Sequence, residues 1–177
     1  DESVSQHDSS TGCVLQVATA NVCTLNVSKY DHSVISAEGL NALGRAQLLE
    51  NQFAEHGLDV VCIQEGRAAD DQVRAGAAYD MYIAGALDGS YGSQIWIKKS
   101  MHAVVLMASA ISPRIMTVAI RLRDHEPITI ISAHAPCLLS PPAARGAFWC
   151  ELARATTTLR TRWPSAVMIV GIDANAR

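Results

Sequence analysis

Four apolar, strand-like segments of the chain each end in a side chain that could bind a cation or a phosphate. Asn21 follows VATA, Glu65 follows VVCIQ, and Asp173, with Asn175 two residues later, follows MIVGI. His134 ends the segment ITIISAH. Groups at the ends of adjacent buried strands meet at one rim of a sheet, where rigid strands fix them and loops stay adaptable. We therefore expect these five side chains to form one site.

The chemistry of this set is that of a hard cation and a phosphate. Its carboxylate and amide oxygens, without a thiolate, suit Mg²⁺ or Mn²⁺ and suit Zn²⁺ poorly. Mg²⁺ keeps several waters and a substrate phosphate oxygen in its shell, so one or two carboxylates suffice. Together with a water oriented by an Asp, this set is suited to in-line attack on phosphorus.

Taken singly, each residue has a simpler explanation. Glu65 could be a solvated loop residue or a helix cap, and Asn21 could be a turn residue. Asp173 and Asn175 could form an Asx turn, the commoner fate of a D-x-N sequence. His134 could be a hydrogen-bonded histidine at a strand end. Chance seldom ends four buried strands in this way, so the four together favour a site.

The elements that position these residues follow from the apolar pattern. A β-branched and apolar run from Cys13 predicts a strand that ends near Asn21. Apolar residues spaced by three or four predict an amphipathic helix over Ala37–His56, with Gly57 just past its end. LDVVCIQE predicts a short buried strand, so the order strand, helix, strand indicates a layered α/β protein.

The middle of the chain is rich in strands, and a long helix precedes the last one. We expect strands over Tyr79–Ala84, Ser93–Lys98 (alternating between two faces), His102–Met107, Arg114–Leu122 and Ile128–His134. A Ser-Pro turn and the hairpin turn RDHEP join the last three. Ser140 is the expected N-cap of a helix that opens with two prolines and ends before Pro164. The apolar stripe expected on this helix comprises Trp149, Leu152, Thr156, Leu159 and Trp163.

The composition fits one globular domain. Of the 177 residues 49% are apolar, and we expect a domain over residues 13–177 behind a polar, disordered lead-in over residues 1–12. A net charge of −3 gives no electrostatic sign of a nucleic-acid partner. Five cysteines without a CxxC pair predict buried, reduced thiols, with a disulfide framework or a zinc site as the alternative. No apolar run reaches membrane-spanning length, so no membrane contact is expected, and the oligomeric state stays open.

Ordered blocks of the chain resemble the endonuclease/exonuclease/phosphatase (DNase I-like) superfamily. They are VATANVCTLN, GLDVVCIQEGRA, GSQIWIKKS, ITIISAHAPC, a helix with FWCEL, and AVMIVGIDANA, covering about Val14 to Ala176. They look most like the endonuclease domains of LINE-type retrotransposons. The resemblance implies a sandwich of two facing β-sheets flanked by helices, and Mg²⁺-dependent nicking of DNA. An intracellular, nuclear location is implied by the retroelement resemblance only.

The resemblance also implies a role for each residue at a matching position. Glu65 matches a metal-binding glutamate, and Asn21 matches an asparagine that supports the metal and phosphate site. His134 falls where relatives place a Tyr or His that contacts the scissile phosphate. Asp173 matches the aspartate that orients the attacking water, and Asn175 matches an asparagine that stabilises charge in the transition state.

The chain departs from the family pattern in several places. Cys23 stands where relatives often have Arg or Asp, Gly66 replaces a Thr, and Ala174 replaces a Phe. Arg67 could help to hold phosphate, although a solvated Arg is the simpler explanation. Relatives continue past the D-x-N block to a Ser-Asp-His-like motif, whereas this sequence stops at Arg177. We therefore expect a C-terminally truncated, inactive part of a domain with an uncovered sheet edge and low stability.

Two alternatives stay open. The same superfamily contains phosphoinositide phosphatases, sphingomyelinases and deadenylases, and residues at strand ends do not choose among them. From a different class, the chain could be a noncatalytic remnant or a binding module. Intact Glu65, His134, Asp173 and Asn175 argue against long decay.

Overall fold

The computed structural model describes residues 14–23, 25, 44–123 and 125–175. The predicted lead-in over residues 1–12 lies outside these ranges. No helix within them is long and apolar enough to cross a membrane. In chain order the elements are β1 (Val17–Asn21), α2 (Arg45–Glu55), β2 (Val60–Gln64), β3 (Gln72–Ala75), β4 (Tyr79–Ile83), β5 (Gln94–Lys98), a 3-10 turn (Lys99–Met101), β6 (Val104–Ser112), β7 (Ile115–Arg121), β8 (Ile128–His134), α3 (Pro142–Arg162) and β9 (Val167–Asp173).

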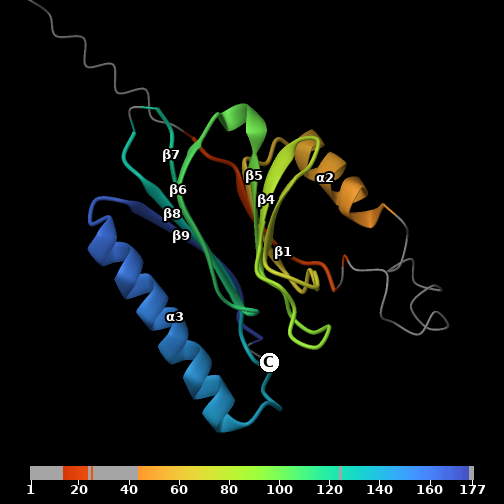
Figure 1. The fold of residues 1–177 in the computed structure, drawn as a ribbon, viewed down its shortest axis with the longest axis vertical. Coiled ribbons are helices and arrows are strands. Elements are labelled where there is room, and N and C mark those ends of the chain that lie inside the picture. Colours follow the sequence, from red (N-terminus) through yellow and green to blue (C-terminus); the bar gives the residue numbers. More distant parts are fainter. Residues whose placement is uncertain (1–13, 24, 26–43, 124, 176–177) are drawn as a thin grey trace, which may run out of the picture.

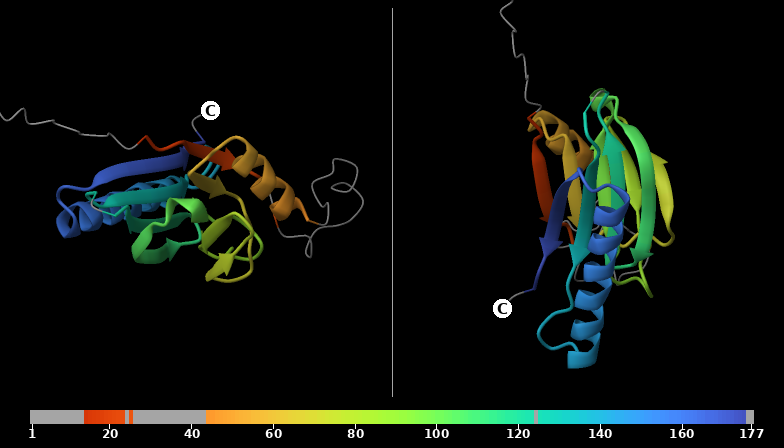
Figure 2. Two further views of the ribbon diagram at one scale, coloured as in Figure 1. Left: turned by 90° about the horizontal axis from the view of Figure 1, so that it is seen from above. Right: turned by 90° about the vertical axis from the view of Figure 1, so that its left-hand side faces the viewer.

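The strands form two sheets that face each other (Figure 1). The first sheet has the order β1-β2-β5-β4-β3 and the second has the order β6-β7-β8-β9. α2 covers the outer face of the first sheet and α3 covers the outer face of the second, as Figure 2 also shows. The structure thus confirms the expected α/β sandwich of two sheets flanked by helices.

Apolar contacts hold the four layers together. Between the sheets, Ile95 and Val118 belong to one buried cluster. Phe53 of α2 packs edge-on against Trp96, with ring centroids 5.8 Å apart, and Phe148 of α3 packs against the second sheet. Because helices cover their outer faces, the central strands are continuous apolar runs rather than alternating ones.

Several strand predictions need correction. β5 is buried on both faces from Gln94 to Ile97, so the alternation expected there does not separate an inner face from a solvent face. The strand expected over His102–Met107 begins at Val104 and runs on to Ser112. β3 was not predicted, because all four of its residues are exposed and it has no buried apolar pattern. The two antiparallel connections, β6 to β7 and β7 to β8, are confirmed.

The helix predictions are confirmed in type and corrected in detail. The helix expected over Ala37–His56 is α2, which begins at Arg45; residues 37–43 lie outside the described ranges. Gly57 follows it with φ 70, as expected for a residue just past a helix end. Ser140 is not the N-cap of α3. Pro141 takes that position, because a residue that precedes a proline is pushed out of the helical region.

The buried stripe of α3 lies one residue away from the predicted one at its start. Phe148 is buried, whereas Trp149 is 48% exposed. Leu159 is buried as expected, and Leu152 and Trp163 pack partly against the second sheet. Phe148 and Trp149 are adjacent, so either one continues the helical spacing of Leu152 and Leu159. Only the contact with the second sheet shows that Phe148 is the buried one.

The cysteines of the described residues are free, but most of them are not buried. Cys62 lies between the sheets, where burial raises the pKa of its thiol to about 12. Cys23, Cys137 and Cys150 are exposed, so the prediction of burial is wrong for these three. They lie in loops near the site and on the outer face of α3, where no apolar layer covers them.

β1 and β9 are each an edge strand of their sheet, with β3 and β6 at the opposite edges. Both β1 and β9 carry exposed apolar side chains: Val17 is 38% exposed, Val167 62% and Val170 45%. An apolar edge of this kind fits the expectation of an uncovered sheet edge. The low stability inferred from it stays a prediction.

Candidate metal and phosphate site

Two pairs of parallel strands bring the predicted residues to one rim of the sandwich. In the first sheet, β1 pairs with β2 so that Asn21 lies opposite Gln64, and Glu65 comes next. In the second sheet, β8 pairs with β9 so that His134 lies opposite Asp173. The two pairs face each other. The structure therefore gathers all the residues singled out in the sequence: Asn21, Glu65, Arg67, His134, Asp173 and Asn175.

A buried polar layer, not predicted from the sequence, lies directly behind this rim. Gln64 donates through Nε2 to Ser132 Oγ at 3.2 Å and to the carbonyl oxygen of Gly171 at 3.4 Å, across the gap between the sheets. Thr19 donates to Gln64 Oε1 at 3.1 Å. A Cβ at Gly171 would overlap Cys62, so the glycine lets β9 approach β2 closely. These contacts fix the separation of the sheets, and with it the separation of the site residues.

Asn21 joins the two carboxylates. Its Nδ2 donates to Glu65 Oε1 at 3.0 Å and to Asp173 Oδ2 at 2.8 Å. Its Oδ1 accepts the backbone N–H of Cys23 at 3.0 Å, which fixes the orientation of the amide. The amide nitrogen, rather than the oxygen, therefore points at the carboxylates.

Glu65 is held as a carboxylate. Arg67 donates to its Oε2 at 2.6 Å. Burial would raise the pKa of Glu65, but the hydrogen bonds from Asn21 and Arg67, with the charges of His134 and Arg67, outweigh that effect. Its pKa lies below the ordinary value, so the side chain is ionised at neutral pH.

His134 is buried between the carboxylates and the arginines. Burial lowers the pKa of its imidazole, Glu65 and Asp173 raise it, and Arg114 and Arg67 lower it; the net pKa is below the ordinary value. The ring is therefore neutral at pH 7. Its Nε2 lies 3.6 Å from Glu65 Oε1, and its Nδ1 is buried without a hydrogen-bond partner among the described residues.

Asn175 ties the end of β9 to the end of β8. Its backbone N–H donates to Asp173 Oδ1 at 3.0 Å, which is the Asx turn foreseen as the simpler explanation. Its Nδ2 also donates to the carbonyl oxygen of Ala135 at 2.6 Å and lies 3.1 Å from His134 Nε2. The turn and the site are therefore compatible, because the turn aims the amide at the imidazole.

Glu65, Arg67, His134 and Asn175 line a polar cavity of about 260 Å³. Its lining also includes Tyr91 and Arg114, which were not predicted. Arg114 donates to the carbonyl oxygen of His134 at 2.9 Å, and its guanidinium lies 3.6 Å from the centroid of the Tyr91 ring. Arg67 and Arg114 give the cavity two guanidinium groups, which are well suited to bind phosphate oxygens.

The backbone around the polar cavity adopts an unusual conformation. Glu65, Arg67, Tyr91 and Asn175 all line it, and all have left-handed φ values, of 57°, 53°, 69° and 47°. Residues other than glycine adopt this backbone region at an energetic cost, and residues in this conformation gather at functional sites. The clustering of four of them supports a functional role for this cavity.

The donor set fits a hard divalent cation. Glu65 and Asp173 converge on one amide group, and oxygen is the ligand atom that Mg²⁺ and Mn²⁺ prefer. Within the described ranges no three side chains of His, Cys, Asp or Glu form a metal-binding group by themselves. The remaining ligands would be water and phosphate oxygens, which Mg²⁺ commonly retains.

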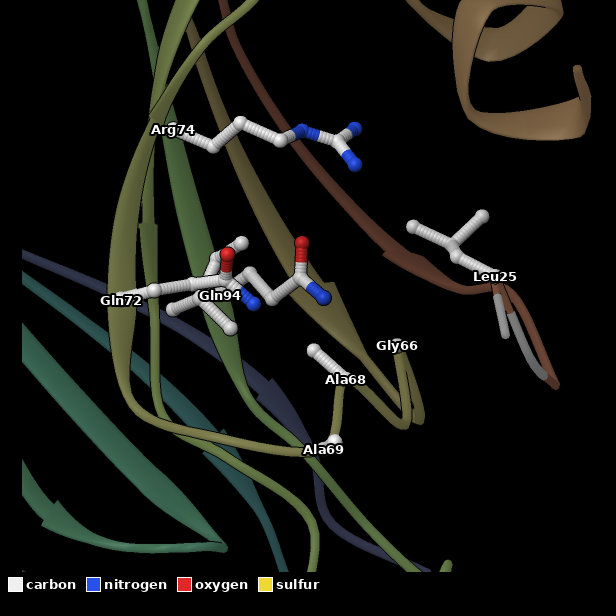
Figure 3. A pocket seen from close by; sticks show the side chains of 8 residues that line it. Leu25, Gly66, Ala68, Ala69, Gln72, Arg74 and Gln94 are labelled. Atoms are coloured by element: carbon white, nitrogen blue, oxygen red, sulfur yellow. The ribbon is translucent and has the colours of Figure 1, made fainter. Parts of the chain in front are cut away.

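The packing around Gly66 explains why a glycine replaces the Thr of the family pattern there. A Cβ at this position would overlap Gln94 Nε2, and the buried Gln94 side chain points toward Gly66 (Figure 3). Gln94 Oε1 in turn accepts from Trp96 Nε1 at 2.8 Å. The small residue thus lets the loop that carries Glu65 and Arg67 lie against the first sheet.

Figure 3 also shows a second cavity, of about 280 Å³, on the far side of this loop. Its lining includes one charged side chain, Arg74, whose guanidinium contacts Met81 Sδ at 3.3 Å. None of the predicted site residues lines it. The polar cavity is therefore the better candidate site.

Solved structures with the same fold include several enzymes. The endonuclease domain of TRAS1, a telomere-specific non-LTR retrotransposon, matches with 20% identity and a TM-score of 0.56, over 93% of this chain and 60% of that one. D. rerio TDP2 complexed with single strand DNA product matches with 16% identity and a TM-score of 0.57, over 92% and 61%. The 3' phosphatase NExo from Neisseria, bound to product DNA hairpin, matches with 15% identity and a TM-score of 0.56, over 89% and 57%.

This chain spans about 60% of the length of these structures. No match was found among curated protein sequences. The family model of the Endonuclease/Exonuclease/phosphatase family matches residues 18–176, which include every predicted site residue. The chain therefore belongs to the Endonuclease/Exonuclease/phosphatase family.

Proposed function

We propose that the protein hydrolyses phosphodiester bonds with the help of Mg²⁺ or Mn²⁺, and that its substrate is DNA, which it nicks as a retrotransposon-type endonuclease. The convergence of Glu65 and Asp173 on Asn21, beside a cavity with two guanidinium groups, carries the proposal. DNA as the substrate is supported by the resemblance to LINE-type endonucleases and by the DNA-bound relatives named above. An intracellular, nuclear location rests on the retroelement resemblance only.

Each residue of the site has a proposed part in the reaction. Glu65 and Asp173 would hold the cation, which neutralises developing charge on the phosphoryl group and polarises one of its oxygens. Asn21 keeps the two carboxylates together. Asp173 also orients the attacking water by accepting a hydrogen bond from it.

The other residues act on the phosphate. Arg67 and Arg114 attract the phosphate oxygens, and the neutral His134 lies close enough to the polar cavity to contact the scissile phosphate. Asn175 would turn one amide N–H from His134 Nε2 toward the charge that develops in the transition state. The carboxylate and guanidinium groups are already held by protein hydrogen bonds, so they need little reorganisation when the substrate binds.

The first test measures binding by this chain. Mn²⁺, which broadens nearby NMR signals, is expected to broaden the backbone amides of Asn21, Glu65 and Asp173. Glu65→Gln should abolish that selectivity. Glu55→Gln, which removes an exposed carboxylate from α2, should leave it unchanged. Uniform broadening in all three proteins would show that this site does not bind the metal.

The second test measures cleavage by the longest protein that the gene encodes. We expect Mg²⁺-dependent nicking of supercoiled plasmid, stopped by EDTA and reduced at least about 100-fold by Glu65→Gln. Nicking by Glu65→Gln at the wild-type rate in saturating Mg²⁺ would overturn the proposed mechanism. Hydrolysis of inositol phosphates, of sphingomyelin or of poly(A), with intact plasmid, would assign the protein to another branch of the family. A wild-type protein that binds Mn²⁺ and cleaves none of them would be a noncatalytic remnant or binding module.

A further inference from the structure

A larger, apolar cavity adjoins the polar cavity. Its volume is about 490 Å³, within the range of small-ligand sites, and it lies between the N-terminal half of α3 and the β6–β7 turn. Tyr91, Arg114 and Ser140 line both cavities. Because the two share a wall, a ligand held by its phosphate in the polar cavity has its next group beside the apolar one.

The lining of the apolar cavity favours a flat organic group. Phe148, Pro113 and Pro136 supply apolar walls, and Ala147 on α3 leaves space between them. Leu87 at its rim is 58% exposed. A ligand in this cavity would therefore cover an apolar side chain that the protein itself leaves in water.

One end of the apolar cavity carries both hydrogen-bond acceptors and donors. Ser112 Oγ donates to Glu151 Oε2 at 2.8 Å, and both residues line the cavity together with Arg154. The carboxylate accepts hydrogen bonds from amino or imino groups, and the guanidinium donates hydrogen bonds to carbonyl oxygens or ring nitrogens. An alkyl chain would leave these polar groups without ligand partners, whereas a heterocycle with polar edges can satisfy them.

The shared wall is a planar stack. The Arg114 guanidinium lies over the Tyr91 ring at 3.6 Å from its centroid. Guanidinium planes and aromatic rings are the surfaces on which proteins stack nucleobases. Since Arg114 also lines the polar cavity, one side chain can contact both a phosphate and the base attached to the same nucleotide.

We propose that the apolar cavity holds one unpaired nucleobase, next to the phosphate that lies in the polar cavity. A base inside a duplex is covered on both faces and cannot enter a cavity of this kind, so the nucleotide must be single-stranded or turned out of the helix. The inference rests on the proposed function for the position of the phosphate. It assigns to Tyr91 and Arg114 the recognition of an unpaired nucleotide.

The test compares binding of two fluorescent strands in EDTA, where no metal-dependent cleavage occurs. One is pentathymidylate, and the other has the same phosphates but abasic tetrahydrofuran residues. The wild-type chain should bind pentathymidylate about tenfold more tightly, the size of one stacking contact. Ala147→Phe, which fills the apolar cavity from an exposed helix position, should remove that difference and leave the abasic strand unaffected. Ala153→Phe, exposed on the same helix and outside the cavity lining, is the matched control and should behave as wild type.

Equal affinities of the wild-type chain for the two strands, or no binding of either, would overturn the inference. So would an Ala147→Phe protein that keeps the preference. A clear base preference together with a plasmid that is never nicked would reject the proposed function alone. Nicking without a base preference would reject the base cavity alone.

Discussion

Asn21 Nδ2 lies 2.8 Å from Asp173 Oδ2, although 152 positions separate the two residues in the chain. The same nitrogen donates to Glu65 Oε1 at 3.0 Å. One amide group therefore stands between two carboxylates that would otherwise repel each other. This relationship links the first strand of one sheet to the last strand of the other.

Removing the amide should destabilise the fold through this repulsion. We expect Asn21→Leu to lower the free energy of unfolding by about 1 kcal/mol at pH 7, as for the loss of an exposed hydrogen bond. The loss should be smaller when Asp173→Asn is already present, because one of the two charges is then absent. Urea unfolding of wild type, Asn21→Leu, Asp173→Asn and the double variant measures this coupling. Equal losses in the two backgrounds would contradict the arrangement.

The lowered pKa of Glu65 predicts a dependence of stability on pH. Its folded-state pKa lies below the unfolded value of about 4.3, so the ionised side chain stabilises the fold above that value. This contribution disappears as the pH falls through the folded-state pKa. The stability difference between wild type and Glu65→Gln should therefore be full at neutral pH and should shrink progressively as the pH falls below about 4.3. Glu55→Gln controls for the loss of one carboxylate, and a constant difference from pH 3 to 7 would refute the prediction.

The imidazole of His134 should titrate below about 6.5, the ordinary histidine value, in an NMR titration. Because its folded-state pKa is lowered, its contribution to stability is present above that ordinary value and is lost as the pH falls through the folded-state pKa. Glu65→Gln should lower the pKa further, since the carboxylate raises it. Arg114→Met should raise the pKa, since the guanidinium lowers it. Shifts in the opposite directions would show that the charges around His134 are placed differently.

Two glycine substitutions should have opposite effects. Gly66→Ala forces Gln94 away from Trp96 Nε1 and leaves a buried donor unpaired, so we expect a loss of about 1–3 kcal/mol in unfolding free energy. Gly146→Ala, in α3 with no atom within 4 Å of the added Cβ, should instead stabilise the protein by about 0.5–1 kcal/mol. Thermal unfolding measures both. An unchanged unfolding free energy in Gly66→Ala would mean that the loop can move away from β5 freely.

The grouping of the strand-end residues could be predicted from the sequence, and the reason is geometric. Parallel strands that pair end at the same edge, so Asn21 and Glu65 had to be neighbours once their strands were adjacent, as did His134 and Asp173. The sequence pattern did not show which atoms of these side chains would face one another. That Asn21 would turn its nitrogen toward the carboxylates depends on the backbone N–H of Cys23, which no sequence pattern reveals.

Other parts of the site could not be predicted, because they depend on how distant segments pack. Tyr91 and Arg114 lie outside the regular strands, and neither has a spacing that points to the other. Their stack depends on the approach of the segment before β5 to the turn before β7. Gln64 is a polar residue at the end of an apolar strand, and its partner Ser132 becomes apparent only when the two sheets face each other.

The link between Asn21 and Asp173 also determines when the site can form during synthesis. At about 5–20 residues per second, a ribosome needs roughly 8–30 s to add the residues between them. Until Asp173 has been added, β8 lacks its parallel partner, and the carboxylate of Glu65 lacks the second carboxylate beside it. A nascent chain therefore cannot assemble this arrangement at the ribosome until β9 has emerged and folded.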